Sequence, residues 1–315
     1  MKQERQRYQA GREPIRILGV RSGMGGRDPG AFGAVDGLRK AGLAERLRAA
    51  GLEARWGQIL EPAQEHAADP AMAIAELAPR LAQAAGNALR AGAFPLVIGG
   101  DHSCAIGTWS GIAAARSAQG PLGLLWIDAH LDSHTPQTSH TGLIYGMPLA
   151  ALLGYGESAF TDCAAPGAKL APQHVCVLGV RSYEPEERAL LDRIGVRVIG
   201  MEEIGRRGIA NTLAEALAIV RGAEGGYGIT IDLDALDPRD APGVGTPAPG
   251  GLRAAELIPA LATVGSDPRL CGLEIAEYNP RRDRKGITAA HALAIAQAVL
   301  GAGAGADAEA VACVA

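Results

Sequence analysis

Short apolar runs recur along the chain, each bounded by glycine, proline or polar residues. Several are apolar at every position, as in Phe94–Ile98 and Leu122–Ile127. Continuous apolar runs are typical of strands in a parallel sheet, because such strands are buried on both faces. We predict about eight strands, at Ile15–Val20, Glu53–Ile59, Phe94–Ile98, Leu122–Ile127, His174–Val180, Val196–Gly200, Gly226–Leu233 and Leu270–Glu277.

Longer segments rich in alanine and leucine, with helical periodicity, separate these runs. The predicted helices are Gly33–Ala50, Ala71–Ala91, Ala105–Ala118, Leu143–Leu153, Glu186–Ile194, Asn211–Arg221, Ala254–Val264 and Thr288–Leu300. Strands that alternate with helices indicate an α/β fold, in which a parallel sheet carries helices on both faces.

No linker or change of composition divides the predicted sheet. We therefore expect one domain over residues 15–300. Residues 1–14 are polar and charged, and we interpret them as a disordered or loosely attached arm. Residues 301–315 form a low-complexity tail of glycine and alanine.

Composition excludes several classes of partner. The formal net charge of -4, without a dense basic run, argues against nucleic acid or an anionic membrane. No apolar run reaches the roughly 18 residues that a membrane span needs. The cysteines are odd in number and have no CxxC pairing, which favours free thiols in a reducing compartment. We predict a cytoplasmic protein; the cysteines are Cys104, Cys163, Cys176, Cys271 and Cys313.

The most informative stretch is Asp128–Asp132, which directly follows the apolar run Leu122–Ile127. Asp128, His130 and Asp132 occupy alternate positions, so on an extended chain their side chains point to one side. Carboxylate and imidazole donors that converge in this way suit a divalent metal ion. The alternative is that these residues cap turns or pack in the core.

Other predicted strands also end in metal-donor residues. The carboxyl ends of parallel strands meet at one edge of a sheet, so these donors would share one site. Four carboxylates there would repel one another unless cations supplied positive charge. Two divalent ions would do so and would activate a shared water. Mostly oxygen donors favour Mn²⁺, with Fe, Co or Ni as alternatives. The donors are His102, Asp128, His130, Asp132, Asp232 and Asp234.

The segments Gly99–Ser103, Asp128–Asp132 and Asp232–Pro238 resemble the three metal motifs of the ureohydrolase superfamily, the arginases and agmatinases. Ala241–Pro247 and Glu277–Pro280 are also similar. The resemblance implies a three-layer αβα sandwich with a central eight-stranded parallel sheet. It further implies two Mn²⁺ per subunit, a trimer or hexamer, and hydrolysis of a small guanidino substrate with release of urea.

The resemblance also assigns roles. His102 and Asp128 would bind one metal ion and His130 the other, with Asp132, Asp232 and Asp234 completing or bridging the pair. Asp132 would in addition orient the attacking hydroxide. Glu277 would pair with the substrate guanidinium, since a carboxylate and a planar cation make a strong directional contact. Thr246 would be a second polar contact.

Among ureohydrolases the chain resembles arginases more than agmatinases. Thr135–Thr138, with Gly142 and Gly146–Pro148, is similar to the arginase loop that holds the amino-acid end of the substrate. Arg181–Glu187 is similar to the acidic segment that faces the substrate amino group, although its acids could instead form a solvated helix start. The implied substrate-binding residues are His134, Ser139, Thr141, Glu184, Glu187 and Thr246.

The substrate loop departs from the arginase pattern. His134 and Leu143 stand where arginases have asparagine, and Tyr145 replaces the histidine associated with proton transfer. A tyrosine with an ordinary pKa of about 10 is a poor acid–base catalyst at pH 7. His140 or His134 could take its place, or each could simply be a surface histidine of the loop. Three functions stay open. The protein could be an arginase, or a metal-binding homologue of reduced activity. It could also hydrolyse another guanidino or amidino compound, such as agmatine, a guanidino acid or formiminoglutamate.

Overall fold

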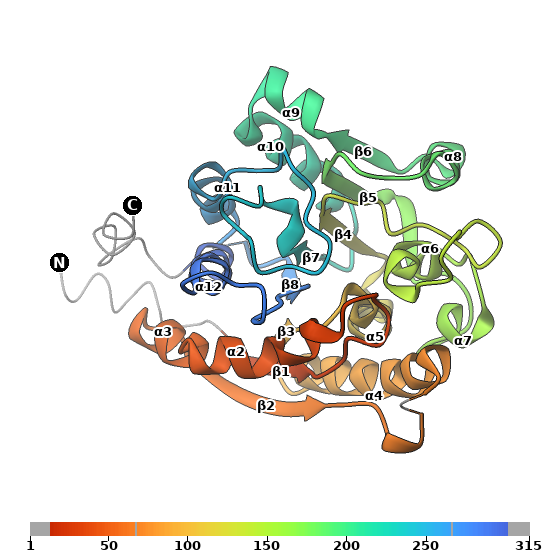
Figure 1. Ribbon diagram of the computed structural model, residues 1–315, viewed down its shortest axis with the longest axis horizontal. Coiled ribbons are helices and arrows are strands. Elements are labelled where there is room, and N and C mark those ends of the chain that lie inside the picture. The colour runs from red at the N-terminus through yellow and green to blue at the C-terminus, as the bar shows by residue number, and fades with distance from the viewer. Residues whose placement is uncertain (1–12, 67, 266, 302–315) are drawn as a thin grey trace.

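A computed structural model describes residues 13–66, 68–265 and 267–301 (Figure 1). Over these residues, eight strands form one sheet in the order β2-β1-β3-β8-β7-β4-β5-β6, and every neighbouring pair is parallel. The predicted parallel α/β fold is confirmed. The strands are β1 (Ile15–Val20), β2 (Ala54–Leu60), β3 (Phe94–Ile98), β4 (Leu122–Ile127), β5 (Leu170–Val180), β6 (Arg197–Gly200), β7 (Tyr227–Asp232) and β8 (Leu270–Ala276).

Helices cover both faces of the sheet (Figure 1). One layer contains α4 (Pro70–Arg90), α5 (Ala105–Arg116), α6 (Pro148–Leu152) and α7 (Ser158–Thr161). The other contains α2 (Ala34–Lys40), α3 (Leu43–Ala49), α9 (Met201–Arg207), α10 (Ile209–Val220), α11 (Ala254–Leu261) and α12 (Ile287–Val299). The helix α8 (Pro185–Ile194) contacts the edge strand β6.

The inner strands β3, β4, β7 and β8 are almost fully buried because each one supplies two cores. In β4, Leu125 and Ile127 pack in the core beneath one helical layer, and Leu124 and Trp126 pack in the core beneath the other. All four side chains are fully buried. Side chains of successive residues point to opposite faces of a strand, so a sheet covered on both sides needs apolar residues at every position.

Two predicted helices differ from the structure. The segment Gly33–Ala50 forms two short helices, because Gly42 adopts a left-handed backbone conformation with φ +85° between α2 and α3. The segment Leu143–Leu153 contains a 3₁₀ turn at Ile144–Gly146, and its α-helix begins only at Pro148. The α conformation is disfavoured for the residue before a proline, here Met147, so the 3₁₀ turn and the α-helix do not form one continuous helix.

The predicted arm and tail lie almost entirely outside the described residues, which begin at 13 and end at 301. Within the described part of the chain, no helix is long and apolar enough to cross a membrane. Cys104, Cys163, Cys176 and Cys271 are buried free thiols, and Cys313 lies outside the described range.

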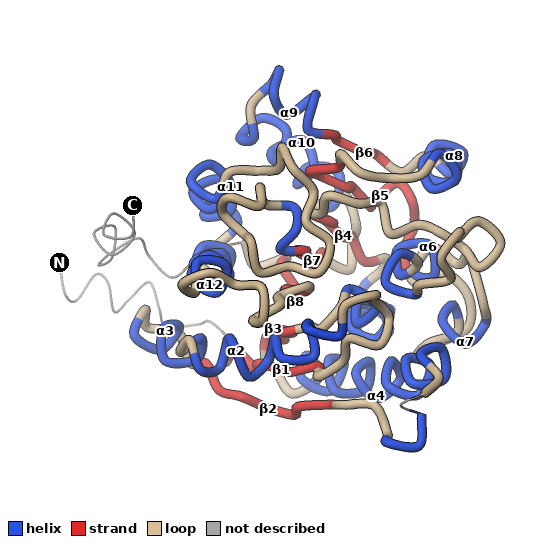
Figure 2. Tube along the Cα trace, in the orientation of Figure 1, coloured by secondary structure: helices blue, strands red, loops and turns tan. Residues whose placement is uncertain are grey.

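The four central strands place the predicted site. In the order β3-β8-β7-β4, each strand is followed at its carboxyl end by a motif singled out in the sequence. Loops gather around these strands (Figure 2). The motifs are Gly99–Ser103, Glu277–Pro280, Asp232–Pro238 and Asp128–Asp132.

Candidate metal centre

Residues far apart in the sequence meet where the central strands end. The backbone N–H of His102, after β3, donates to Glu277 Oε1, after β8, at 2.9 Å. The backbone N–H of Ala129, after β4, donates to Asp234 Oδ1, after β7, at 3.3 Å. Adjacent parallel strands therefore bring all four motifs to one edge of the sheet, as predicted.

The first donor cluster surrounds His102. Its Nδ1 lies 3.1 Å from Asp128 Oδ2, 3.1 Å from Asp132 Oδ2 and 3.4 Å from Asp232 Oδ2. The imidazole is fully buried and stacks on the ring of Trp126 at a centroid distance of 4.3 Å. One nitrogen and several carboxylate oxygens at this spacing are a set of ligands that could hold a divalent ion.

The second donor cluster contains His130. Its Nδ1 lies 3.1 Å from Asp234 Oδ2 and 3.4 Å from Asp128 Oδ1. Asp128 thus belongs to both clusters, with one oxygen facing each histidine. A carboxylate shared in this way would connect two ions, so the arrangement suits a binuclear centre.

A buried hydrogen-bond chain orients His102. Thr230 Oγ1 donates to Glu274 Oε1 at 2.8 Å, and its own oxygen lies 2.9 Å from His102 Nε2. Since the hydroxyl proton is used on Glu274, the oxygen accepts from Nε2–H. Nδ1 therefore faces the carboxylates. Burial lowers the pKa of His102, but hydrogen bonds to the carboxylates of Asp128, Asp132 and Asp232 outweigh it and raise the pKa well above its ordinary value. A metal ion that replaced the proton on Nδ1 would take the same lone pair, so this histidine is oriented for metal binding.

The electrostatics of the carboxylates give the same result. Burial raises the pKa of Asp232 well above its ordinary value, and the nearby charges of Asp234 and Asp128 raise it further. Burial likewise raises the pKa of Asp132 to about 7, with the charge of Asp128 adding to the effect. Neighbouring buried carboxylates cannot all stay ionised at neutral pH without added positive charge. Two divalent cations would supply it, so these residues fit a binuclear metal centre.

Two site residues have unusual backbone conformations. Asp132 has φ +46° and Glu277 has φ +65°, in the left-handed region that favours glycine. The carbonyl of Asp132 accepts from the N–H of Leu149 at 2.9 Å, and the N–H of Glu277 donates to Gly100 O at 2.8 Å. Left-handed residues persist where surrounding contacts hold them, and they are frequent at functional sites.

Glu277 lies directly beside the first cluster. Its carboxylate is buried, and Oε1 accepts from the backbone N–H of His102. Burial raises its pKa well above the ordinary value, and the charges of Asp101 and Asp234 contribute. A buried carboxylate in this position would be stabilised by a cation, which agrees with the predicted contact to a guanidinium group.

Tyr145 and Thr246 lie together at the same site. Their side chains are hydrogen-bonded, and Tyr145 is close enough to Glu277 and Asp132 to feel their charges. Burial raises the pKa of the Tyr145 hydroxyl. The phenol is therefore neutral at pH 7 and acts as a hydrogen-bonding group.

His140 lies at an exposed position. Its side chain is 71% exposed, and Nε2 lies 3.9 Å from Glu186 Oε1. Its ring meets that of His134 edge-on, at a centroid distance of 6.5 Å. These contacts place His140 beside the start of α8, whereas Tyr145 is the loop residue that lies near the donor clusters.

The predicted substrate loop meets α8. His134 Nε2 lies 3.1 Å from Glu184 Oε2 and 3.6 Å from Glu187 Oε2. Glu184 and Glu187 also form a capping box at the start of α8. Burial raises the pKa of Glu187 to about 7.

The hydroxyls of Ser139 and Thr141, two of the predicted substrate-binding residues, make hydrogen bonds within their own loop. Ser139 Oγ accepts from Gly142 N–H at 2.9 Å, and Thr141 Oγ1 accepts from Leu143 N–H at 3.3 Å. Both hydroxyls therefore stabilise the turn that leads to Tyr145.

Sequence reasoning missed two residues that hold the site together. Arg181 donates to six backbone carbonyls: those of Gly179, Asp234, Ala235, Leu236, Ala248 and Pro249. Asp101 accepts from Gly25 N–H at 3.0 Å and from Ser103 N–H at 3.1 Å. The signal for each was its position next to a strand end, in motifs where other residues drew attention.

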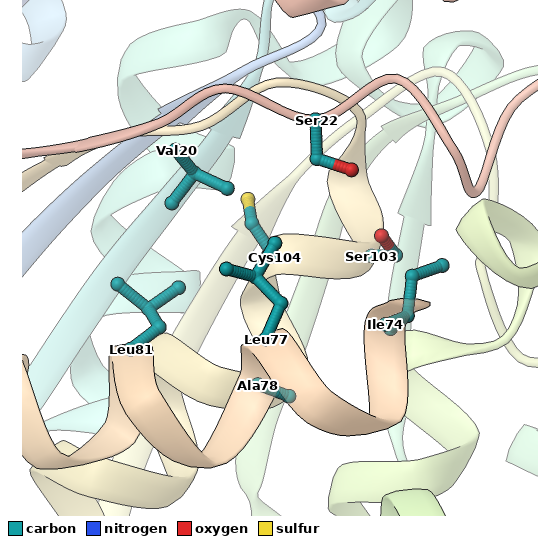
Figure 3. A pocket seen from close by; sticks show the side chains of 8 residues that line it. All are labelled: Val20, Ser22, Ile74, Leu77, Ala78, Leu81, Ser103 and Cys104. Carbon is teal, nitrogen blue, oxygen red and sulfur yellow. The ribbon is translucent and has the colours of Figure 1, made fainter. Parts of the chain in front are cut away.

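A small cavity of about 10 Å³ is lined in part by Ser103 and Cys104, the two residues that follow His102 in the sequence (Figure 3). It is enough for about one water molecule. The side chain of Cys104 faces it, and the same thiol lies 3.4 Å from Glu274 Oε2. Its lining consists of Val20, Ser22, Ile74, Leu77, Ala78, Leu81, Ser103 and Cys104.

Comparison with known proteins agrees with the geometry. The family model described as "Arginase family" matches residues 13–301. Arginase from Bacillus caldovelox is 36% identical over 297 residues, which cover 92% of this chain and 98% of that protein. Arginase from Brevibacillus brevis is 38% identical over 292 residues, covering 90% and 97%.

Solved structures show the same similarity. The B. caldovelox arginase structure has a TM-score of 0.86 to this chain at 36% identity and covers 92% of this chain and 98% of its own. Arginase from Bacillus cereus has a TM-score of 0.86 at 33% identity, with 92% and 99% covered.

The fold, the paired donor clusters and these similarities define a hydrolase of the ureohydrolase type. The chain belongs to the arginase family. The resemblance and the eight-stranded αβα fold expected from the motifs are thereby confirmed. Membership implies a binuclear metal centre and a small-molecule substrate, and the clusters around His102 and His130 contain residues that could hold the two ions.

Proposed function

We propose that this protein is an arginase, which adds water to the guanidinium group of arginine and releases ornithine and urea. The observation that supports it most strongly is the pair of donor clusters joined by Asp128, with the buried carboxylate of Glu277 beside them. Two curated relatives that cover most of this chain, at 36% and 38% identity, are arginases.

We assign the ions by the two clusters. His102, Asp128, Asp132 and Asp232 would hold one, and Asp128, His130 and Asp234 the other. Bound divalent ions lower the pKa of water and stabilise negative charge that develops on oxygen. Mn²⁺ is the proposed metal because the donors are mostly carboxylate oxygens with two imidazole nitrogens, a mixture that also accepts Fe, Co or Ni.

The protein's own residues position the substrate. Glu277 would hold the guanidinium by charge-assisted hydrogen bonds and so place its central carbon at the metal centre. The Thr246 and Tyr145 hydroxyls, which are bonded to each other, would offer a second polar contact from the neighbouring side.

The reaction also needs one proton transfer. Water loses a proton when it attacks the guanidinium carbon, and the departing amine needs one. Asp132 is buried at the site with its carboxylate beside the other donors, so it can accept the first proton and return it to the amine. The Tyr145 phenol stays neutral, and His140 is exposed beside the start of α8. Asp132 is therefore better placed than either residue to transfer the proton.

The far end of the substrate would meet the loop from His134 to Leu143 and the start of α8. Glu184, with a side chain 55% exposed, would face the amino group, and Glu187 and His134 would hold Glu184 in place. Ser139 and Thr141 would contribute hydroxyl contacts from the rim of the same loop.

A urea-release assay over a panel of guanidino compounds tests this proposal. With Mn²⁺ added, we expect turnover of arginine to exceed that of agmatine, guanidinobutyrate and formiminoglutamate, the last followed as formamide. A panel member turned over faster than arginine would support the second candidate, a hydrolase of another guanidino or amidino compound. Leu143 favours that candidate, because its side chain cannot donate a hydrogen bond to a substrate carboxylate.

Tyr145→His supplies the matched variant for this assay. If Tyr145 silences the site, only the variant will release urea. Strong activity of the unaltered protein excludes a silenced homologue. Metal analysis of the same sample should give two Mn per chain, and failure to bind Mn together with no urea release would refute the proposed function.

We further propose a cytoplasmic homo-oligomer, a trimer or hexamer. The four buried free thiols support a reducing compartment, and the family resemblance supports the assembly. Sedimentation of the purified protein measures the mass of the assembly directly.

A further inference from the structure

A third group of donors lies outside the two clusters. His134 follows β4, and Glu184 and Glu187 begin α8, which contacts the edge strand β6 (Figure 1). His134 Nε2 is 3.1 Å from Glu184 Oε2 and 3.6 Å from Glu187 Oε2, and one ligand atom from each residue lies within 4.8 Å of the others. His134 and Glu187 are buried, whereas the Glu184 side chain is 55% exposed.

Local hydrogen bonds orient the ring of His134. Thr138 Oγ1 accepts from Thr135 N–H at 2.9 Å and lies 3.1 Å from His134 Nδ1. With Nδ1 hydrogen-bonded to this hydroxyl, Nε2 is directed at the carboxylates of Glu184 and Glu187. A metal ion that replaced the proton between these atoms would form three coordinate bonds.

Both carboxylates are fixed before any ion binds. Glu187 Oε1 accepts from Ser133 N–H at 3.1 Å, and Oε2 accepts from Glu184 N–H at 3.0 Å. The Glu184 side chain accepts from the N–H of Glu187 in the capping box. Each carboxylate keeps lone pairs free, so the site needs little rearrangement to bind a cation.

We propose that His134 Nε2, Glu184 Oε2 and Glu187 Oε2 form a third metal site, separate from the binuclear centre, that takes one Zn²⁺ or similar borderline ion. Ligands about 2.0–2.2 Å from a tetrahedral ion lie roughly 3.3–3.6 Å apart, close to the separations from Nε2 found here. One imidazole and two carboxylates are a common ligand set for Zn²⁺, and the exposed side of Glu184 leaves room for water as a fourth ligand.

The third ion would affect the reaction through the substrate's far end. This consequence rests on the proposed function, in which Glu184 faces the substrate amino group. A cation on Glu184 removes that contact and repels the ammonium, so Zn²⁺ would raise KM for arginine while kcat changes little.

Direct metal binding tests the site. The full-length protein is loaded with two equivalents of Mn²⁺, desalted, and titrated with Zn²⁺ by calorimetry, with elemental analysis of Mn and Zn in the product. We expect one Zn²⁺ to bind while both Mn²⁺ remain. Glu184→Gln should weaken this binding at least about 10-fold, and His134→Ala about 100-fold or more, since each removes one ligand.

Glu186→Gln is the matched control, because Glu186 lies in the same helical turn and contacts His140. It should bind Zn²⁺ as the unaltered protein does. The thermal midpoint of each variant checks that it is folded. The proposal is overturned if the unaltered protein binds Zn²⁺ only by releasing Mn²⁺, or if Glu184→Gln and His134→Ala bind it equally well.

A cluster that is only an ion pair between an imidazolium and two carboxylates would give no Zn²⁺ uptake, which also overturns the proposal. Urea release from arginine, measured on the Mn²⁺-loaded sample before Zn²⁺ is added, reports the proposed function separately. Zn²⁺ uptake without urea release would leave the third site standing, and urea release without Zn²⁺ uptake would leave only the proposed function.

Discussion

Arg181 offers the sharpest test of how this site is held. Its guanidinium lies among six backbone carbonyls, and its shortest bonds reach Asp234 O at 2.7 Å and Ala248 O at 2.8 Å. Arginine has five N–H donors, so the longer contacts share a donor. The guanidinium thus joins the loop that carries a metal donor, Asp234, to the loop that contains Ala248.

Arg181→Met keeps much of the aliphatic side chain and removes every donor. A hydrogen bond from a charged group contributes about 1.5–3 kcal/mol, so losing the two shortest bonds alone should cost about 3–6 kcal/mol. That is a large part of the roughly 5–15 kcal/mol that stabilises a typical protein. Arg181→Lys should lose less, because an ammonium keeps three donors but cannot reach carbonyls on opposite sides at once.

The measurement is denaturant unfolding of the metal-free protein, followed by Mn²⁺ titration of the folded variants. We expect Arg181→Met to lose stability as above and to bind its second Mn²⁺ about 10-fold or more weakly, because Asp234 is no longer held. An Arg181→Met protein that unfolds within about 1 kcal/mol of the unaltered chain, with unchanged Mn²⁺ affinity, would refute this role.

Three further outcomes are expected. Glu277→Gln keeps an acceptor for the His102 N–H but removes the charge, so kcat/KM for arginine should fall about 100-fold or more in a urea assay while the thermal midpoint stays close to that of the unaltered protein. Trp126→Phe removes the indole N–H that donates to Asp128 at 2.9 Å, and calorimetry should show Mn²⁺ affinity lower by about 10–100-fold; unchanged affinity would show that this bond does not orient Asp128. Glu187 has a folded pKa of about 7, above its unfolded value, so in the metal-free protein the unfolded state releases this proton first as pH rises. Its contribution to stability is full below about pH 4.5, falls by up to roughly 1.4 kcal/mol per pH unit towards pH 7, and is constant above that. Glu187→Gln should lack this slope in denaturation curves measured from pH 4.5 to pH 8, and equal slopes in both proteins would contradict the assignment.

The fold was predictable because its signals are local. A parallel sheet covered on both faces requires strands such as Leu122–Ile127 that are apolar at every position, and this pattern is visible in the sequence alone. The break at Gly42 was not predicted, because a glycine inside a helical pattern is often tolerated. The order of the strands was also out of reach, since it depends on contacts between segments distant in sequence.

The metal donors were predictable for a related reason. Alternate spacing at strand ends brings Asp128, His130 and Asp132 to one site, and parallel strands bring His102 and Asp234 to the same edge. The role of Arg181 was not predictable, because its partners are backbone carbonyls, which every residue has whatever its side chain. The position of His140 depends on how an irregular loop folds, and residue type alone does not determine that.

The place of β8 in the sheet has a consequence for the order of folding. This strand is the last within residues 13–301, it lies between β3 and β7, and among the described strands it alone joins β2-β1-β3 to β7-β4-β5-β6. Until β8 inserts, His102 belongs to one half of the sheet and its partners Asp128 and Asp232 to the other. Long-range pairing of this kind is slow and comes late in folding. A nascent chain that ends before Leu270 therefore contains all six donors but cannot bring them together around His102. Metal binding at the first cluster thus requires that β8 has joined the sheet.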